Sequence, residues 1–187
     1  MERGKMKRVL VAIADGIEEL ETIGITDMLD RAGAEVTTAS VNHLTIIASH
    51  KTKITADKLI SDCEDEEYDM IVCPGGLPGA EYLRDNQTLI KLLKKQQSAG
   101  KYYAAICAAP VVVFHQHGLI GDRAATAYPS LATKLPNLSK ISEAVVVDGN
   151  CITGQGAGVV MQFSLILIEK LFSKEKADMI KKSMLIR

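Results

Sequence analysis

Cys107 is the residue whose type and position first suggest chemistry. The segment YYAAICAAP (102–110) runs from strand-forming residues straight into this cysteine, and two alanines and a proline then open an apolar helical segment. A thiol at such a turn lies at the positive end of the helix, where unpaired amides and the helix dipole favour the thiolate. Because this setting lowers a cysteine pKa from ~8.5 to roughly 3.5–7.5, we expect a nucleophile. A buried, inert cysteine is the alternative, and position alone leaves both open.

Glu21 is the second candidate, because it is a carboxyl group on a helix face that should be buried. A buried carboxylate is costly, so such a group is neutral with a raised pKa or has a dedicated partner. A protonated Glu21 could donate a hydrogen bond to a thiolate and move protons during catalysis. Alternatively, Glu21 reaches solvent or caps a loop. At about 100° per residue, the arc that contains it also holds Ile17, Leu20, Gly24, Ile25, Met28 and Ala32.

A glycine-rich loop is the third candidate. The segment CPGGLPG (73–79) follows a predicted strand, and the backbone amides of Gly75 and Gly76 are free to face a small oxyanion. Beside Cys107, this loop becomes a candidate oxyanion hole. Asp15 and Glu18 match an N-terminal capping box, which is a structural role.

Composition and charge narrow the class of protein. The 187 residues carry 22 basic and 23 acidic side chains without a basic stripe and include no tryptophan, so nucleic acid is not an expected partner. No apolar window is long enough to span a membrane, and no secretory signal is recognised. The four cysteines lack metal-ligand or disulfide spacing. We therefore expect no metal, no cofactor and a cytoplasmic location.

The elements that must position these residues alternate between strand and helix. Strands are predicted at 7–14, 34–41, 70–76, 102–106 and 124–128, with hairpins within 45–57 and 143–154; helices are predicted at 17–33, 87–100, 108–117 and 158–172, followed by a helical tail. This alternation predicts an α/β fold with a doubly wound, mostly parallel sheet and helices on both faces. We expect one domain over 1–187, with 1–6 disordered or extra. Ligands of such folds gather at the carboxyl ends of the strands.

Four segments together resemble the ThiJ/PfpI superfamily (DJ-1-like), in the branch of the parkinsonism-associated deglycase. They are IADGIEELETIGITDMLDRAGAEVTTASV, YDMIVCPGGLPGAEYLRD, AAICAAP and CITGQGAG, in this order along the chain. The resemblance implies a flavodoxin-like homodimer with Cys107 at a nucleophile elbow. It also implies that Glu21 is the protonated partner of Cys107, and that Gly75, Gly76 and Ala108 supply backbone amides.

Three departures from the family pattern modify these expectations. Ala108 stands where the protease-like branch has a histidine, so we discount peptidase activity. Tyr128 stands where several members have a histidine; we expect it to bind substrate without acting as that base. His50 follows Ser49 where an arginine is frequent, so an anion or dimer contact there should be weaker and pH-dependent.

The resemblance implies an enzyme that uses Cys107 to detoxify reactive dicarbonyls. It would convert methylglyoxal to lactate without glutathione, or remove early glycation adducts from proteins or nucleotides. The alternative is an oxidative-stress sensor or redox-regulated chaperone that uses oxidation of Cys107 without turnover. A binding domain with an inert cysteine is a third reading. The apolar helix at 158–172 suggests a subunit contact within a homodimer.

Overall fold

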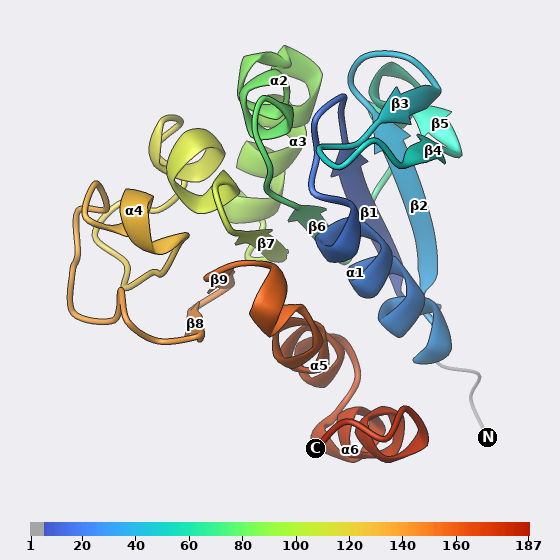
Figure 1. Cartoon of the computed structure of the whole chain (residues 1–187), viewed down its shortest axis with the longest axis vertical. Coiled ribbons are helices and arrows are strands. Elements are labelled where there is room, and N and C mark those ends of the chain that lie inside the picture. Colours follow the sequence, from blue (N-terminus) through green and yellow to red (C-terminus); the bar gives the residue numbers. More distant parts are fainter. Residues whose placement is uncertain (1–5) are drawn as a thin grey trace.

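A seven-stranded sheet forms the centre of the computed structural model, which describes residues 6–187 (Figure 1). The strand order is β5-β2-β1-β6-β7-β9-β8, and all neighbours run parallel except β8 and β9. The strands are β1 (Arg8–Ile13), β2 (Glu35–Ser40), β5 (Lys58–Leu59), β6 (Met70–Cys73), β7 (Tyr102–Ile106), β8 (Val145–Asp148) and β9 (Cys151–Gly154). A separate hairpin pairs β3 (Thr45–Ile47) with β4 (Lys53–Thr55).

Helices cover both faces of the sheet, as predicted (Figure 1). Helix α1 packs against α5 and α5 against α6, whereas α2 packs against α3 and η2. The helices are α1 (Glu19–Arg31), α2 (Gly79–Asp85), α3 (Gln87–Ser98), α4 (Pro129–Ala132), α5 (Val160–Leu171) and α6 (Lys174–Ser183), with a π-helical segment η2 (Pro110–His115) and short 3-10 turns η1 (Ile60–Cys63) and η3 (Ala157–Val159). Within the described residues, every helix is too short or too polar to span a lipid bilayer.

The strand order reverses between β1 and β6, because β2 follows β1 on one side while β6 lies on the other. The two strands are lined by buried aliphatic residues on both faces, which is why their sequences read as continuous apolar runs. Loops that leave the carboxyl ends of β1, β6 and β7 therefore meet at one edge of the sheet. This reversal point is where ligands of open α/β sheets bind.

The predicted α/β architecture and both hairpins are confirmed. The predicted strand at 124–128 is wrong, because its amides donate to two side chains and to the Cys107 carbonyl rather than to a neighbouring strand. The Ala124 amide donates to Asp148 (2.9 Å), and the Thr126 amide donates to the Thr153 hydroxyl (2.9 Å). Helix α2 was not predicted, since its first residues Pro78 and Gly79 resemble a loop. The N-terminal prediction for 1–6 falls almost wholly on residues 1–5, outside the described residues.

The predicted buried face of α1 is correct except at one edge. Glu21, Gly24, Ile25 and Met28 are buried. Leu20, however, is 52% exposed, because the buried arc is rotated away from it toward Thr22 and Leu29. The carboxyl group of Glu21 is therefore enclosed by the fold, as its position on the helix predicts.

Candidate active site

Cys107 occupies a strained turn directly after β7. Its φ angle of 63° lies in the left-handed region, which costs a residue with a side chain of order 1–3 kcal/mol. Hydrogen bonds from both sides hold it there: the Cys107 amide donates to the Gly154 carbonyl (2.9 Å), and the Tyr128 amide donates to the Cys107 carbonyl (2.7 Å). The backbone is thus fixed on both sides of the thiol, which gives the sharp strand-to-helix turn of a nucleophile elbow.

Gly75 lets the loop after β6 lie directly against this turn. A Cβ atom at residue 75 would stand 2.5 Å from the Cβ of Cys107 and 2.9 Å from the amide nitrogen of Ala108. Gly76 is equally constrained, with a φ of 85° and only 2.5 Å between an added Cβ and the Glu18 amide nitrogen. Both glycines are needed because backbone approaches backbone at this point.

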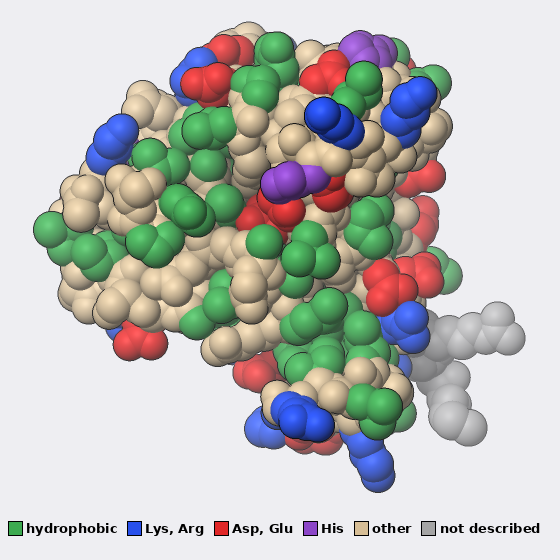
Figure 2. Space-filling view, viewed as in Figure 1, with side chains coloured by type: hydrophobic (Ala, Val, Ile, Leu, Met, Phe, Trp, Pro, Cys, Tyr) green, Lys and Arg blue, Asp and Glu red, His purple; other side chains and the backbone are tan. Residues whose placement is uncertain are grey.

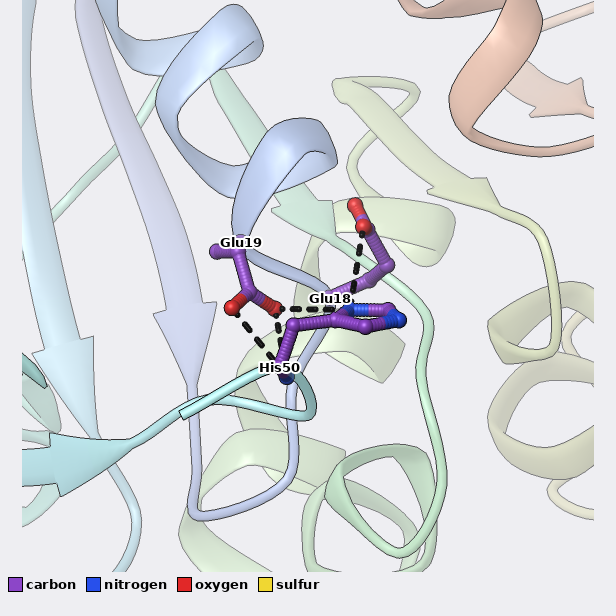
Figure 3. Close-up of side chains that lie close together, drawn as sticks. All are labelled: Glu18, Glu19 and His50. Atoms are coloured by element: carbon purple, nitrogen blue, oxygen red, sulfur yellow. Dashed lines mark hydrogen bonds and ion pairs between the residues drawn. The ribbon is translucent and has the colours of Figure 1, made fainter. Parts of the chain in front are cut away.

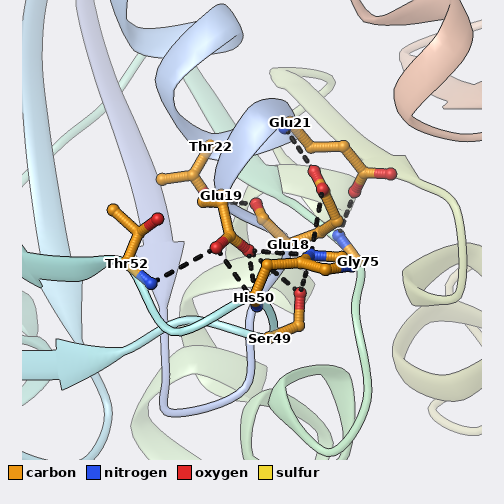
Figure 4. Close-up of polar contacts among 8 residues, drawn as sticks. All are labelled: Glu18, Glu19, Glu21, Thr22, Ser49, His50, Thr52 and Gly75. Atoms are coloured by element: carbon orange, nitrogen blue, oxygen red, sulfur yellow. Dashed lines mark hydrogen bonds and ion pairs between the residues drawn. The ribbon is translucent and has the colours of Figure 1, made fainter.

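Glu21 reaches the same point from α1 and is fully buried. One carboxyl oxygen, Oε2, accepts a hydrogen bond from the Gly75 amide at 2.7 Å (Figure 4). Among the described residues, Oε1 has no hydrogen-bond partner, so it is the oxygen available to the nearby Cys107 thiol. Burial raises the pKa of Glu21 to about 7, although the Gly75 amide and Cys107 favour the ionised form. At neutral pH this group therefore exists in both protonation states.

The Cys107 thiol does not have the lowered pKa expected from its position. Burial is the main cause that raises its pKa to about 12, and the Glu21 carboxylate raises it further. The amides of Gly76 and Ala108 act in the opposite direction. The expectation was wrong because the charged neighbour is an acid rather than a base, and because only the short π-helical segment η2 follows the turn.

The loop amides divide into two groups. Those of Gly76 and Ala108 face the Cys107 sulfur, where an oxyanion formed on a bound substrate would lie. The Gly75 amide instead binds Glu21 and orients its carboxyl group. The structure thus brings Cys107, Glu21 and the three loop residues expected from sequence to one place.

Tyr128 lies on the open side of the thiol. Its ring and the Cys107 sulfur flank Gly156: a Cβ added there would be 3.5 Å from Tyr128 Cδ2 and 3.8 Å from Cys107 Sγ. A surface groove of about 300 Å³ begins at this glycine. It is lined by Tyr128, Pro129, Gln155, Gly156, Ala157, Gly158 and Val159. Gly156 had not been singled out from sequence, although the segment CITGQGAG that contains it had been.

A larger groove of about 530 Å³ lies away from the thiol. Its lining includes Lys7, directly before β1, and Leu171 at the end of α5. These residues are at the amino end of β1, opposite to the end where Cys107 and Glu21 meet. Volume alone therefore does not mark the reactive site.

His50 belongs to a different cluster, on the outer side of α1 (Figure 3). Its backbone amide donates to the Glu19 carboxylate (3.0 Å), as does the Ser49 hydroxyl (3.0 Å). Partial burial opposes ionisation of Glu19, but the Glu19 and His50 amides outweigh it and hold its pKa at about 2. The His50 side chain is 76% exposed, so this cluster fastens the β3–β4 turn to α1 and does not contact the thiol.

The cluster of Glu18, Glu19 and His50 has the side-chain types that could bind a metal ion. Ligand atoms of Glu18, Glu19 and His50 lie within 4.8 Å of one another. However, Oε2 of Glu18 already caps α1 by accepting from the Glu21 amide (2.6 Å), and Glu19 is bound to the turn (Figure 4). These bonds account for the carboxylates without a metal. They also correct the predicted capping box, because Asp15 accepts instead from the Ile47 amide at 2.8 Å.

Comparison with known proteins places these features in a wider group. Residues 7–170 match the model of the DJ-1/PfpI family. The chain is 44% identical over 180 residues to Protein DJ-1 homolog B of Arabidopsis thaliana, covering 96% of this chain and 41% of that protein. It is 30% identical over 163 residues to the glutathione-independent glyoxalase DJR-1.2 of Caenorhabditis elegans, covering 86% of each.

A solved structure shows the same fold. The structure of oxidized DJ-1 from Toxoplasma gondii matches with a TM-score of 0.92 and 42% identity, covering 96% of this chain and 98% of that one. By contrast, the chain spans less than half of the plant relative's length.

Proposed function

This chain belongs to the DJ-1/PfpI family, and from that premise we propose that it is a cysteine-dependent enzyme acting on small α-oxoaldehydes. Its reaction would convert methylglyoxal to lactate without glutathione. The observation that carries the proposal is the buried Glu21 carboxyl group, whose pKa of about 7 and free oxygen beside Cys107 suit it to move protons. The name of the nematode relative, a glutathione-independent glyoxalase, supports this choice.

Activation of the nucleophile is the first step of the proposed mechanism. The thiol proton passes from Cys107 to the ionised carboxyl group of Glu21, and the sulfur attacks the aldehyde carbon to form a hemithioacetal. The amides of Gly76 and Ala108 stabilise the negative charge on its oxygen. The strained turn at Cys107 and the Gly75 hydrogen bond hold both reacting groups in place before substrate arrives.

An internal proton shift then completes the oxidation and reduction. Glu21 first gives the thiol proton to the hemithioacetal oxygen. It then moves a proton from the former aldehyde carbon to the adjacent carbonyl carbon, while the hydroxyl proton passes to the neighbouring oxygen, so the first carbon becomes a thioester carbonyl and the second bears a hydroxyl group. Water cleaves the thioester, releasing lactate and restoring the thiol. One water is consumed, and no electrons leave the substrate, so the reaction needs no external oxidant. Removal of early glycation adducts would begin with the same thiol.

A redox sensor or redox-regulated chaperone is the second candidate. Cys107 would be oxidised to a sulfinic acid, and protonated Glu21 would donate a hydrogen bond to it. The half-buried thiol beside a group with a pKa near 7 favours this role as much as the first. The relative from Toxoplasma gondii, whose structure is described as oxidized, adds support. Such a protein is consumed stoichiometrically, whereas an enzyme cycles.

Peptidase activity is not part of the proposal, since Ala108 occupies the place of the protease-like branch's histidine. A homodimer and a cytoplasmic location remain predictions from the sequence and the family. Tyr128 is proposed to contact substrate rather than to act as a base.

Methylglyoxal consumption with chiral detection of lactate tests the proposal. We expect many turnovers per chain, and a loss of at least about 100-fold in Cys107→Ser and in Glu21→Gln. Cys63→Ala and Glu64→Gln are the controls. These residues lie in and directly after η1, which packs mainly against β5, β2 and α3, so both variants should leave turnover unchanged. No turnover, with Cys107 still oxidised rapidly by peroxide, would favour the sensor.

A further inference from the structure

We propose that the groove beside Cys107 selects α-oxoaldehydes with an uncharged, flat substituent larger than a methyl group, and that Tyr128 is the residue that determines this preference. This inference rests on the proposed function, because it concerns the substituent of the substrate that Cys107 attacks. It extends that function by assigning a substrate class to a part of the surface that catalysis itself does not require.

The groove borders the reacting sulfur through Gly156, since Cys107 itself does not line it. Gly156 leaves open the space between the Cys107 sulfur and the Tyr128 ring, since a Cβ added there would be 3.8 Å from one and 3.5 Å from the other. A substrate whose aldehyde carbon is bonded to sulfur must direct its substituent away from the buried Glu21. The open direction is past Gly156, over the ring of Tyr128.

Tyr128 is held in register with the nucleophile. Its amide donates to the Cys107 carbonyl at 2.7 Å, so a backbone hydrogen bond joins the two residues. Pro129 follows and begins α4, which restricts the backbone on the other side. The side chain is 50% exposed and stands over the groove. An exposed aromatic ring held rigidly beside a nucleophile provides a surface on which a flat group can stack.

The lining chemistry excludes charged substituents. None of the seven residues that line the groove carries a charge, and two glycines and an alanine form much of its surface. A phosphorylated or carboxylate-bearing aldehyde would lose hydration there without gaining a charged partner. The volume of about 300 Å³ exceeds what a methyl group fills and can accommodate a phenyl ring. An aryl α-oxoaldehyde therefore fits this surface better than methylglyoxal does.

The same chemistry applies to this substrate. Phenylglyoxal would form a hemithioacetal with Cys107, undergo the proton shift through Glu21, and be released by water as mandelate. One water is added, one carbon is oxidised and its neighbour is reduced, as for methylglyoxal.

The test compares kcat/KM for phenylglyoxal and methylglyoxal, with mandelate and lactate as the measured products. We expect the intact protein to favour phenylglyoxal by about tenfold, from one stacked ring. Tyr128→Ala should lose most of that ratio, because loss of the ring contact raises the KM for phenylglyoxal more than the KM for methylglyoxal. Tyr128→Phe should retain the ratio, because the ring and not the hydroxyl is the contact. Tyr82→Ala is the matched control, since Tyr82 is 43% exposed on α2, outside the groove.

A second variant, Gly156→Ala, tests the groove at the residue between Tyr128 and Cys107. Gly156→Ala places a methyl group at ordinary contact distance from both Tyr128 and Cys107, so the fold should tolerate it. It should lower kcat/KM for phenylglyoxal more than for methylglyoxal. Turnover of methylglyoxal with a substrate ratio that neither Tyr128→Ala nor Gly156→Ala changes would overturn the substrate assignment alone. Failure of the intact protein to turn over either aldehyde would overturn the proposed function, and the substrate assignment with it.

Discussion

Cys107 and Glu21 titrate as a pair, because the Glu21 carboxylate raises the pKa of Cys107 while the hydrogen bond from Cys107 lowers the pKa of Glu21. With one proton between them, the proton resides on sulfur most of the time, and the reactive form has it on the Glu21 carboxyl group. The Glu21 carboxylate therefore suppresses the resting thiolate, and in the proposed mechanism it would also be the base that generates the thiolate during attack.

The free energy of unfolding should depend on pH, because burial raises the pKa of Glu21. Its pKa of about 7 in the folded protein exceeds the ordinary value of ~4.3, so between these pH values the folded state binds more protons than the unfolded state. Its contribution is therefore most favourable below about pH 4 and is lost as pH rises through about 7. Urea unfolding measures the free energy of unfolding of the intact protein and of Glu21→Gln. We expect the difference between them to shift by about 2–3 kcal/mol in favour of Glu21→Gln as the pH rises from about 5 to about 8. Parallel stability profiles for the two proteins would contradict the burial of a neutral carboxyl group.

The pH dependence of the Cys107 alkylation rate should show whether Cys107 and Glu21 share one proton. Above about pH 7, the first proton has left most pairs, so the population with a neutral Glu21 and a thiolate stops growing. The alkylation rate of Cys107 should then level off, while in Glu21→Gln it should continue to rise about tenfold per pH unit, giving about a tenfold difference near pH 8. Iodoacetamide labelling of Cys107 followed by mass spectrometry measures both rates. Coincident profiles would show that the two groups do not share a proton.

At the scale of elements, three loops are joined through one residue. The Gly75 amide donates to Glu21, its carbonyl accepts from the Glu18 amide (3.0 Å), and its missing side chain admits the Cys107 turn. The loops after β1, β6 and β7 thus hold one another in position. The geometry of the proposed active site is a property of this junction rather than of any one element.

Gly75→Ala tests the junction. Its Cβ would overlap the Cβ of Cys107 and the backbone of Ala108, atoms that cannot move without displacing the turn. We expect a loss of about 2–4 kcal/mol in the free energy of unfolding, together with loss of turnover. Gly158→Ala is the matched control, because nothing lies within 4 Å of an added Cβ there, and it should cost less than about 0.5 kcal/mol. Equal stability of the two variants would show that the junction is looser than its geometry implies.

At the scale of the whole molecule, the predicted homodimer requires an exposed apolar surface that can form the subunit contact. Helix α5, the contact suggested by the sequence, places its buried residues, Phe163 and Leu167 among them, inside the chain itself. Exposed apolar side chains remain on α1, where Leu20 is 52% and Ile23 is 50% exposed. Figure 2 shows apolar side chains gathered over α1 and α5 on the face turned to the viewer.

Light scattering should give the mass of two chains at micromolar concentration. If α1 forms the contact, Ile23→Lys should shift the mass to that of one chain, because it would bury an unpaired charge. Met179→Lys is the control, since Met179 is 64% exposed on α6. A single-chain mass for the intact protein would contradict the homodimer, and a dimer insensitive to Ile23→Lys would exclude α1 as the contact.

Local sequence was sufficient to predict the architecture and to single out Cys107 and Glu21, which the fold brings together. Hydrophobic periodicity depends only on neighbouring residues, so it predicted the parallel sheet, both hairpins and the burial of Glu21. The change from strand-forming residues to Ala-Ala-Pro marked the turn at Cys107 in the same way. The family resemblance identified the partnership of these two residues.

Only the tertiary structure decided the pKa of Cys107, the hydrogen-bond partner of the Gly75 amide and the conformation of residues 124–128. The pKa of Cys107 depends on burial and on a carboxyl group from another helix, so its direction was wrong when judged from the turn alone. Gly75 was expected to bind an oxyanion, but its amide meets Glu21, a contact between residues 54 positions apart. The segment 124–128 has strand-like residues, yet distant side chains satisfy its backbone. Each of these outcomes depends on long-range contacts, which local periodicity does not encode.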